Sequence, residues 1–377
     1  MQQNQQEEEL VHTYTVASVV LKPGSARPQP RGGATLTQVA NGDVYLIGGA
    51  SREAACFGDV HKLDLDTREW TLIKAENDKF PARSGHSAVA VDTRIFVFGG
   101  LNSTTCEVYN DVHIFDTQSR KWSKVKIADG EVPMPRNAHA AILLPPAEAQ
   151  DSYRRMMIYG GSSPDDGAFD DAFVLQIPVT SAEPSGKEHL KWEKLERCTG
   201  EKLEARELHC ATLLPGSSSS SSPLVCFTGG RNSDGNICTD MALLDLKTWD
   251  WQLVPICEWN RCSHVAGLVN GTLVSFGGFD GGAIRNDCWE YHGNAESWMR
   301  VNTGADRDNV DGISGHEKTD CLETSPAVQE RFGHAGCTVT TISRVVDKEK
   351  TAKQALLVFG GMNASSDLDD LVLIEQR

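Results

Sequence analysis

The sequence predicts an all-β protein, a six-bladed β-propeller with four antiparallel strands in each blade. Three observations predict it. Six Gly-Gly doublets recur along the 377 residues, each closing a run of apolar and β-branched residues such as VYLIGG or IFVFGG. An arginine precedes each run, and a tryptophan follows most of them. Self-similarity at a period of tens of residues indicates a repeat architecture, and four short strands per unit with Gly-rich turns are typical of a propeller blade.

Each repeat presents its strands in the same order. The arginine opens an alternating stretch that predicts the first strand, and the apolar run into the doublet predicts the second. An aspartate then precedes a third strand, and the tryptophan marks the fourth. The doublets are Gly48-Gly49, Gly99-Gly100, Gly160-Gly161, Gly229-Gly230, Gly277-Gly278 and Gly360-Gly361. The fourth-strand tryptophans are Trp70, Trp122, Trp192, Trp251 and Trp298.

Each repeat feature has a physical cause. β-Branched and aromatic residues suit a pleated surface that is buried between neighbouring blades. Glycine tolerates positive φ angles and lets another backbone approach closely, as a tight exit from a central strand requires. A tryptophan fills the gap between blades where it widens away from the axis, and we expect its N–H to reach a carbonyl oxygen.

The repeats imply one domain. We predict a polar tail over residues 1–12 and a single propeller over residues 13–377. The sixth repeat lacks a tryptophan, so residues 13–21 are expected to supply its outermost strand, with Tyr14 in the place of the tryptophan. Such a strand closes the ring and pairs a free sheet edge. The repeats span approximately 31–74, 83–126, 136–196, 206–255, 261–302 and 331–377, with a polar insertion at 303–330.

Composition excludes several classes of function. A formal net charge of −16 argues against nucleic acid or an anionic membrane as a direct partner. The eleven cysteines are scattered without a CxxC pair, which predicts neither a disulfide framework nor a zinc site. No apolar stretch approaches the roughly 20 residues that cross a bilayer, and the start MQQNQQEEEL is no secretory signal. We therefore expect a cytoplasmic monomer without direct membrane insertion.

The arginines are the first candidate partner-binding residues. They should border one mouth of the central channel, where guanidinium groups could grip the carboxylates of an acidic segment. Histidines follow five of them, at His86, His139, His209, His264 and His334. The alternative is that these side chains bond backbone within and between blades, and their recurrence in every unit favours it. The arginines are Arg31, Arg83, Arg136, Arg206, Arg261 and Arg331.

The loops after the doublets are the second candidate surface, because loops on a rigid scaffold often carry recognition. Their polar positions are Arg52, Asn102, Arg231, Asn232, Asp280, Arg285 and Asn363. Enzymatic interpretations are weaker. Histidines at sixfold positions lie too far apart to share one ion, no phosphate-binding loop occurs, and paired acids fall in turns or at strand starts. We predict no catalytic residue, metal or cofactor.

The pattern of an arginine in the first strand, apolar residues into Gly-Gly and a tryptophan in the fourth strand resembles the kelch repeat family. Within it, residues 44–70, 289–303 and 357–374 resemble the small stand-alone Rab effectors with kelch motifs. That resemblance implies a protein that binds a GTP-bound late-endosomal Rab GTPase. It also implies a role in endosome to trans-Golgi vesicle transport, peripheral on endosomal membranes through the partner.

Two other functions stay open from the sequence. One is a receptor for a peptide or a C-terminal carboxylate, such as a ubiquitin-ligase substrate adaptor, which would use the arginine-lined face. The other is a metal-dependent propeller enzyme. Retention by GTP-loaded but not GDP-loaded Rab GTPases favours the effector, capture of a cullin adaptor or a free peptide favours the receptor, and bound iron or copper favours the enzyme.

Overall fold

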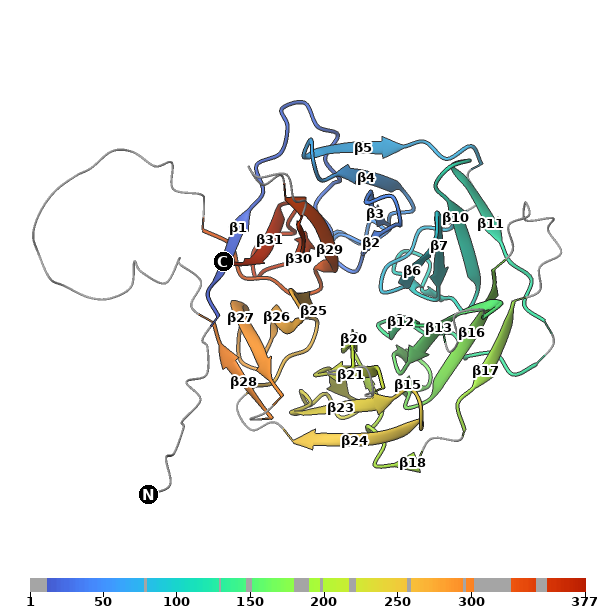
Figure 1. Cartoon of the computed structure of the whole chain (residues 1–377). Coiled ribbons are helices and arrows are strands. Elements are labelled where there is room, and N and C mark those ends of the chain that lie inside the picture. The colour runs from blue at the N-terminus through green and yellow to red at the C-terminus, as the bar shows by residue number, and fades with distance from the viewer. Residues whose placement is uncertain are drawn as a thin grey trace, which may run out of the picture.

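The predicted fold class is confirmed by a computed structural model of the chain, in which six β-sheets form a ring of blades (Figure 1). The structure describes residues 12–77, 80–128, 130–146, 151–179, 190–196, 199–216, 222–255, 259–293, 296–301, 327–343 and 351–377. Strands and turns make up these segments, and no helix occurs in them. Nothing within these ranges therefore forms a helix with the length and hydropathy needed to cross a bilayer. The insertion predicted at 303–330 lies mostly outside the described residues.

In the first three blades, consecutive strands pair antiparallel from the centre of the ring outward. The first blade contains β2 (Thr35–Gln38), β3 (Val44–Ile47), β4 (Val60–Asp64) and β5 (Glu69–Ile73). The second contains β6 (Ser87–Val91), β7 (Arg94–Phe98), β10 (Val112–Asp116) and β11 (Lys121–Lys124). The third contains β12 (Ala140–Leu144), β13 (Tyr153–Tyr159), β16 (Ala172–Pro178) and β17 (Lys191–Lys194).

The remaining blades follow the same order. The fourth contains β20 (Cys210–Leu214), β21 (Leu224–Thr228), β23 (Asp240–Asp245) and β24 (Asp250–Pro255), with β18 (Thr199–Gly200) parallel to β24. The fifth contains β25 (Val265–Val269), β26 (Thr272–Phe279), β27 (Ile284–His292) and β28 (Ser297–Arg300). The sixth contains β29 (Ala335–Ser343), β30 (Thr351–Phe359) and β31 (Leu371–Gln376). Short pairs near the doublets are β8 (Leu101–Asn102) with β9 (Glu107–Val108), β14 (Ser162–Ser163) with β15 (Gly167–Ala168), and β19 (Arg206–Glu207) with β22 (Arg231–Asn232).

The sixth blade takes its outermost strand from the other end of the chain. β1 (Tyr14–Ser18) runs antiparallel to β31, with Tyr14 opposite Gln376 and Ser18 opposite Val372. Figure 1 shows this blue strand alongside the red strands of the last blade. The predicted closure of the ring by an N-terminal strand is therefore part of the confirmed fold.

The aromatic residue of each outer strand packs against the preceding blade. Trp70 of the first blade meets Phe359 of the sixth at 5.4 Å between ring centroids, and Trp192 of the third meets Phe98 of the second at 4.9 Å. Tyr14 lies in the apolar cluster shared by blades five and six. One expectation was wrong. The indole N–H groups of Trp70, Trp192, Trp251 and Trp298 have no hydrogen-bond acceptor among the described residues.

Two closed rings of backbone hydrogen bonds join all six blades. In the first ring, the second glycine of every doublet donates its N–H to the carbonyl of the arginine that opens the next blade, at 2.8–2.9 Å. In the second ring, the residue two places after each arginine donates its N–H to the carbonyl oxygen of the equivalent residue in the preceding blade, at 2.8–2.9 Å. The six residues of the second ring all have positive φ angles, and they are Gly33, Gly85, Ala138, Leu208, Ser263 and Gly333.

The first glycine of a doublet cannot carry a side chain, because the next blade approaches it too closely. A Cβ atom at Gly99 would lie 2.7 Å from the carbonyl oxygen of Arg136 and 3.0 Å from the ring of His139, and φ at this position is +67°. The doublet therefore marks a point where two blades touch as well as a tight exit from a strand.

Candidate protein-interaction surfaces

The six repeat arginines lie inside the blades, so they do not line a mouth of the channel. Their exposed fractions are 4% or less. In five repeats one guanidinium nitrogen donates to the carbonyl of the first doublet glycine, as from Arg83 to Gly99 at 2.9 Å, whereas Arg261 bonds the carbonyl of Asn260. The arginines therefore bond backbone within the blades, as the alternative interpretation of the sequence held. They do not form a surface that could bind the carboxylates of a partner.

Each of these arginines also forms an ion pair with an aspartate of its own blade, which lies at or just before the start of the third strand in five blades and inside β27 in the fifth blade. The pairs are Arg31–Asp59, Arg83–Asp111, Arg136–Asp171, Arg206–Asp240, Arg261–Asp287 and Arg331–Asp370. Burial acts to raise the pKa of Asp59, but hydrogen bonds from His61 and Arg31 outweigh it and lower that pKa well below its usual value. The carboxylate is therefore charged at neutral pH, and it neutralises the buried guanidinium.

The five repeat histidines are equally inaccessible. Each is between 5% and 7% exposed. Burial, followed by the charge of the neighbouring arginine, lowers the pKa of His86, His209 and His264 to about 3. The pKa values of His139 and His334 are lowered for the same reasons. All five imidazoles are consequently neutral at physiological pH.

The described residues that line the pocket at the centre of the channel include no charged group. A cavity of about 440 Å³ lies at the axis, lined by all six innermost strands. Small and aliphatic residues such as Ala88, Ala141 and Gly267 form its wall, with Thr37, Thr212 and Thr338 among the few hydroxyl groups. This lining differs from the arginine-bordered mouth that the sequence suggested.

The polar residues of the doublet loops form hydrogen bonds within their own loops or between neighbouring blades. Asn102 accepts from the N–H of Thr104 at 2.9 Å, and Asn363 accepts from Ser366 at 2.8 Å. Asn232 and Asp280 cap their loops in the same way. Arg52 bonds Asp367 at 3.1 Å and thereby ties the first blade to the sixth.

Two further loop cations, Arg231 and Arg285, are paired with Glu207 and Asp280. The side chains of Arg52, Arg231 and Arg285 keep 39%, 44% and 47% of their surface exposed, so they remain accessible although each is paired.

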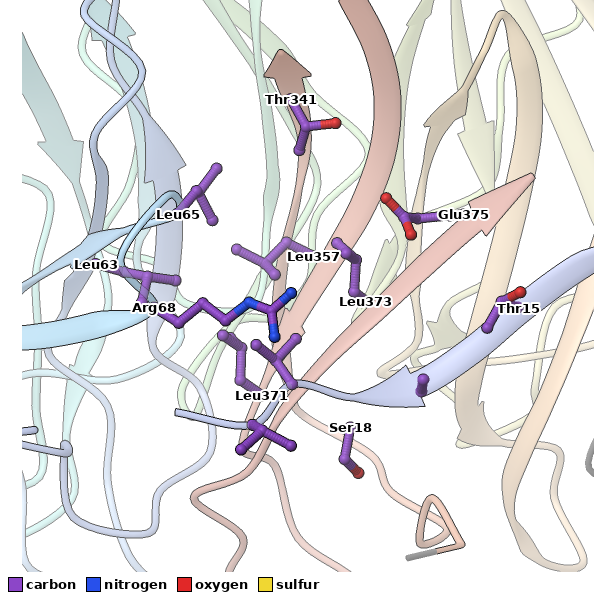
Figure 2. Close-up of a pocket in the computed structure, with 13 residues that line it drawn as sticks. Thr15, Ser18, Leu63, Leu65, Arg68, Thr341, Leu357, Leu371, Leu373 and Glu375 are labelled. Atoms are coloured by element: carbon purple, nitrogen blue, oxygen red, sulfur yellow. The ribbon is translucent and has the colours of Figure 1, made fainter. Parts of the chain in front are cut away.

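A groove that the sequence did not indicate lies at the seam between the sixth and first blades, beside β1. It encloses about 440 Å³ and is shown in Figure 2. Its floor is aliphatic, with Leu63, Leu357 and Leu371 buried, and the partly buried Leu65 and Leu373 pack against the same cluster. A charged residue lies on each of two sides of the groove. Arg68 extends among the leucines, and Glu375 lies across the groove from it. None of the lining residues belongs to the loops that follow the doublets.

Comparison with known proteins agrees with this architecture. The chain matches a family model described as the KLHDC2/KLHL20/DRC7 Kelch-repeats domain over residues 4–217 and 153–319. It is 28% identical to Kelch domain-containing protein 3 of Bos taurus over 267 residues, which are 64% of this chain and 62% of that protein.

Two plant proteins are also similar. Identity with acyl-CoA-binding domain-containing protein 4 of Arabidopsis thaliana is 33% over 132 residues, 35% of this chain. Identity with the serine/threonine-protein phosphatase BSL2 of the same plant is 26% over 377 residues, 96% of this chain. The chain spans 19% and 32% of the lengths of these two proteins, so their whole activities do not carry over to it. The family model covers more than half of the chain, and the chain therefore belongs to the kelch-repeat family of protein-binding propellers.

Proposed function

We propose that this propeller is a non-catalytic effector of a GTP-bound, late-endosomal Rab GTPase, acting in vesicle transport from endosomes to the trans-Golgi. The observation that carries the proposal is where the effector-like segments lie. Residues 44–70 contribute Leu63, Leu65 and Arg68 to the groove, and residues 357–374 contribute Leu357, Leu371 and Leu373. Two segments far apart in the sequence thus converge on one groove, in which Leu65 and Leu373 are partly exposed above a buried aliphatic layer, and exposed apolar surface is typical of a protein-binding site.

The non-catalytic part of the proposal is supported by the state of the titratable groups. The repeat arginines are neutralised by aspartates, and the repeat histidines are buried and neutral. Among the residues that the structure describes, no three His, Cys, Asp or Glu side chains gather in a way that could hold a metal ion. Acid–base chemistry would need an accessible group with a pKa near the working pH.

Nucleotide-dependent binding tests the function directly. The purified protein is immobilised and offered late-endosomal Rab GTPases loaded either with GDP or with a non-hydrolysable GTP analogue. We expect retention of the GTP-analogue form only. An early-endosomal Rab in both nucleotide states is the matched control. Equal retention of the two nucleotide forms, or retention of neither, contradicts the effector proposal.

The proposed location follows from the same partner. A chain with a net charge of −16 is repelled by anionic lipid surfaces, so it depends on the Rab for recruitment to endosomal membranes from the cytoplasm. Fractionation with and without the active Rab provides the measurement, and membrane association that persists after Rab depletion argues against it.

The second candidate is a peptide receptor such as a ubiquitin-ligase substrate adaptor. The buried arginines no longer support it, but the accessible guanidinium of Arg68 in an aliphatic groove does. Co-purification of a cullin adaptor with the expressed chain is the result expected for this candidate. Its absence together with GTP-dependent Rab retention favours the effector.

A further inference from the structure

The groove at the ring-closing seam differs from the equivalent place in the next repeat. Arg68 sits in the turn between β4 and β5 with φ +57°, and Arg120 occupies the matching turn of the second blade with φ +54°. In both turns the carbonyl oxygen accepts a backbone N–H from the segment that enters from the preceding blade. Lys22 donates to Arg68 at 3.0 Å, and Glu76 donates to Arg120 at 2.8 Å.

The two entering residues carry opposite charges. Glu76 places its carboxylate 3.1 Å from the Arg120 guanidinium and neutralises it. Lys22 cannot do so for Arg68, and it pairs instead with Glu69 at 2.6 Å. No other described residue forms an ion pair or side-chain hydrogen bond with Arg68. Its guanidinium is therefore a cation without an ion-pair partner among the described residues, and Figure 2 shows it extending toward Leu357 and Leu371.

The surroundings of Arg68 define what would complement it. Leu63, Leu357 and Leu371 form an apolar floor, and Val20 at the rim is 74% exposed. Glu375 stands across the groove. A guanidinium next to apolar surface binds a carboxylate more strongly than it would in open water, because its neighbours exclude solvent.

We propose that this groove, lined by β1, the turn after β4 and the strands of the sixth blade, binds an extended segment of a partner protein. That segment places leucine-like side chains against the exposed apolar lining, Val20, Leu65 and Leu373, and a carboxylate against Arg68. Glu375 repels a second carboxylate at its own end, so the segment is acidic on the Arg68 side only. The inference rests on the proposed function as a protein-interaction propeller, and it assigns the contact to the seam and not to the doublet loops.

Binding of defined peptides tests the groove. The probes are two fluorescein-labelled peptides that share a pair of leucines, one with glutamates on one side of the pair and the other with lysines there. Fluorescence polarisation should show saturable binding of the glutamate peptide and about tenfold weaker binding of the lysine peptide.

Matched variants locate the contact. Arg68→Glu is expected to weaken the glutamate peptide by about tenfold and to reverse the preference toward the lysine peptide. Arg120→Glu changes the equivalent turn of the next blade and should leave both affinities within about twofold. Val20→Asp is an independent test from the rim and should also weaken the glutamate peptide. All three sites are exposed, and a single cooperative thermal transition in each variant establishes that it folds.

Two results would overturn the inference. They are no binding of the glutamate peptide, or equal losses of its affinity in Arg68→Glu and Arg120→Glu. Failure of the Rab proposal would be seen separately. If the chain binds the glutamate peptide through Arg68 but retains no GTP-loaded Rab, the groove proposal stands and the effector proposal fails. If the chain retains the Rab but does not bind the peptide, the effector proposal stands and the groove proposal fails.

Discussion

Arg136 illustrates what the repeat requires of one side chain. Its guanidinium donates to the carbonyls of Met134 and Gly160 at 3.1 and 3.0 Å, forms an ion pair with Asp171 and lies over the ring of Phe169. One planar group thus joins the entry to the first strand, the end of the second and the start of the third. Lysine has neither the fork geometry nor the number of donors for this task.

Removing this arginine should destabilise the fold strongly. Arg136→Ala leaves Asp171 and two carbonyls without their donor, and we expect the free energy of unfolding to fall by about 3 kcal/mol. Arg120→Ala is the matched control, because its ion pair with Glu76 is exposed, and it should cost less than about 1 kcal/mol. Chemical denaturation gives both values. A similar decrease in the free energy of unfolding in the two variants would show that the buried ion pair stabilises the fold no more than the exposed one.

A second residue-scale prediction concerns the inner hydrogen-bonded ring. Ala138 has φ +54°, where glycine is less strained, and its N–H bonds Gly85 of the preceding blade. Ala138→Gly should therefore raise the free energy of unfolding by about 0.5 kcal/mol, the relief of strain exceeding the added chain entropy. Ala141→Gly in strand β12 should lower it by a similar amount. Denaturant titration decides, and loss of stability in both variants would contradict the strain argument.

At this scale, the sequence predicted which residues recur but not where they point. The arginines recur in every repeat, and an aspartate recurs at or near the start of every third strand. Taken together, those two series could have indicated six internal ion pairs. Burial of Arg31 or Arg206 could not be predicted from either series alone, because it depends on how neighbouring strands cover the side chain.

Among the structural elements, β1 bears the closure of the ring. Its Tyr14 hydroxyl donates to Glu290 of the fifth blade at 2.7 Å, and Glu290 is 2% exposed. His292 bonds the same carboxylate at 2.6 Å. Burial, and then the hydrogen bond to Glu290, raises the pKa of Tyr14, so the phenol stays protonated and remains a donor. The last strand of the ring is therefore held by a buried polar contact as well as by its ladder.

Changes at β1 test this closure. Tyr14→Phe removes one donor to a buried carboxylate and should cost about 1–3 kcal/mol of stability. Tyr153→Phe, at a 43% exposed position in β13, is the control and should cost almost nothing. Deleting residues 1–24 removes the whole strand and should lower the melting temperature of the entire ring in a single transition. An unchanged melting temperature after the deletion would mean that the ring does not depend on β1.

The elements of the closing blade were predictable in outline. A missing tryptophan in the last repeat and a β-like stretch before Arg31 were enough to indicate a shared blade. The groove beside that blade could not be predicted. Its unpaired Arg68 depends on a lysine, Lys22, at the position where the next repeat has Glu76, and only the structure aligns these two residues. A comparison of repeats by sequence alone does not match residues in the segments between blades, where lengths vary.

For the molecule as a whole, the buried histidines predict a strong dependence of stability on pH. An unfolded histidine binds a proton below its usual pKa of 6.5, whereas folded His86, His209 and His264 do so only near pH 3. Their contribution is therefore fully present above pH 6.5 and is lost as the pH falls toward 3. Each histidine reduces the unfolding free energy by about 1.4 kcal/mol per pH unit in that range.

These three groups should unfold the ring between about pH 6 and pH 4, since single domains are stable by only about 5–15 kcal/mol. His139 and His334, whose pKa values are also lowered by burial, act in the same direction. Denaturant midpoints measured from pH 8 to pH 4 provide the check. His209→Gln, which leaves four of the five buried repeat histidines, should show a shallower dependence of the midpoint on pH than the unaltered chain. A midpoint that does not move between pH 7 and pH 5 would refute the link between burial and acid sensitivity.

The closure of the ring has a consequence for how the chain is made. Arg377 bonds Thr15 across a sequence separation of 362 residues. At typical ribosome speeds, roughly 20–70 seconds pass between the emergence of these two residues. During that interval β1 has no strand to pair with, and the growing arc of blades ends in two open edges. Closure of the ring in the cell therefore waits until β31 has been translated, and a nascent chain that stalls before β31 leaves both edges exposed to other polypeptides.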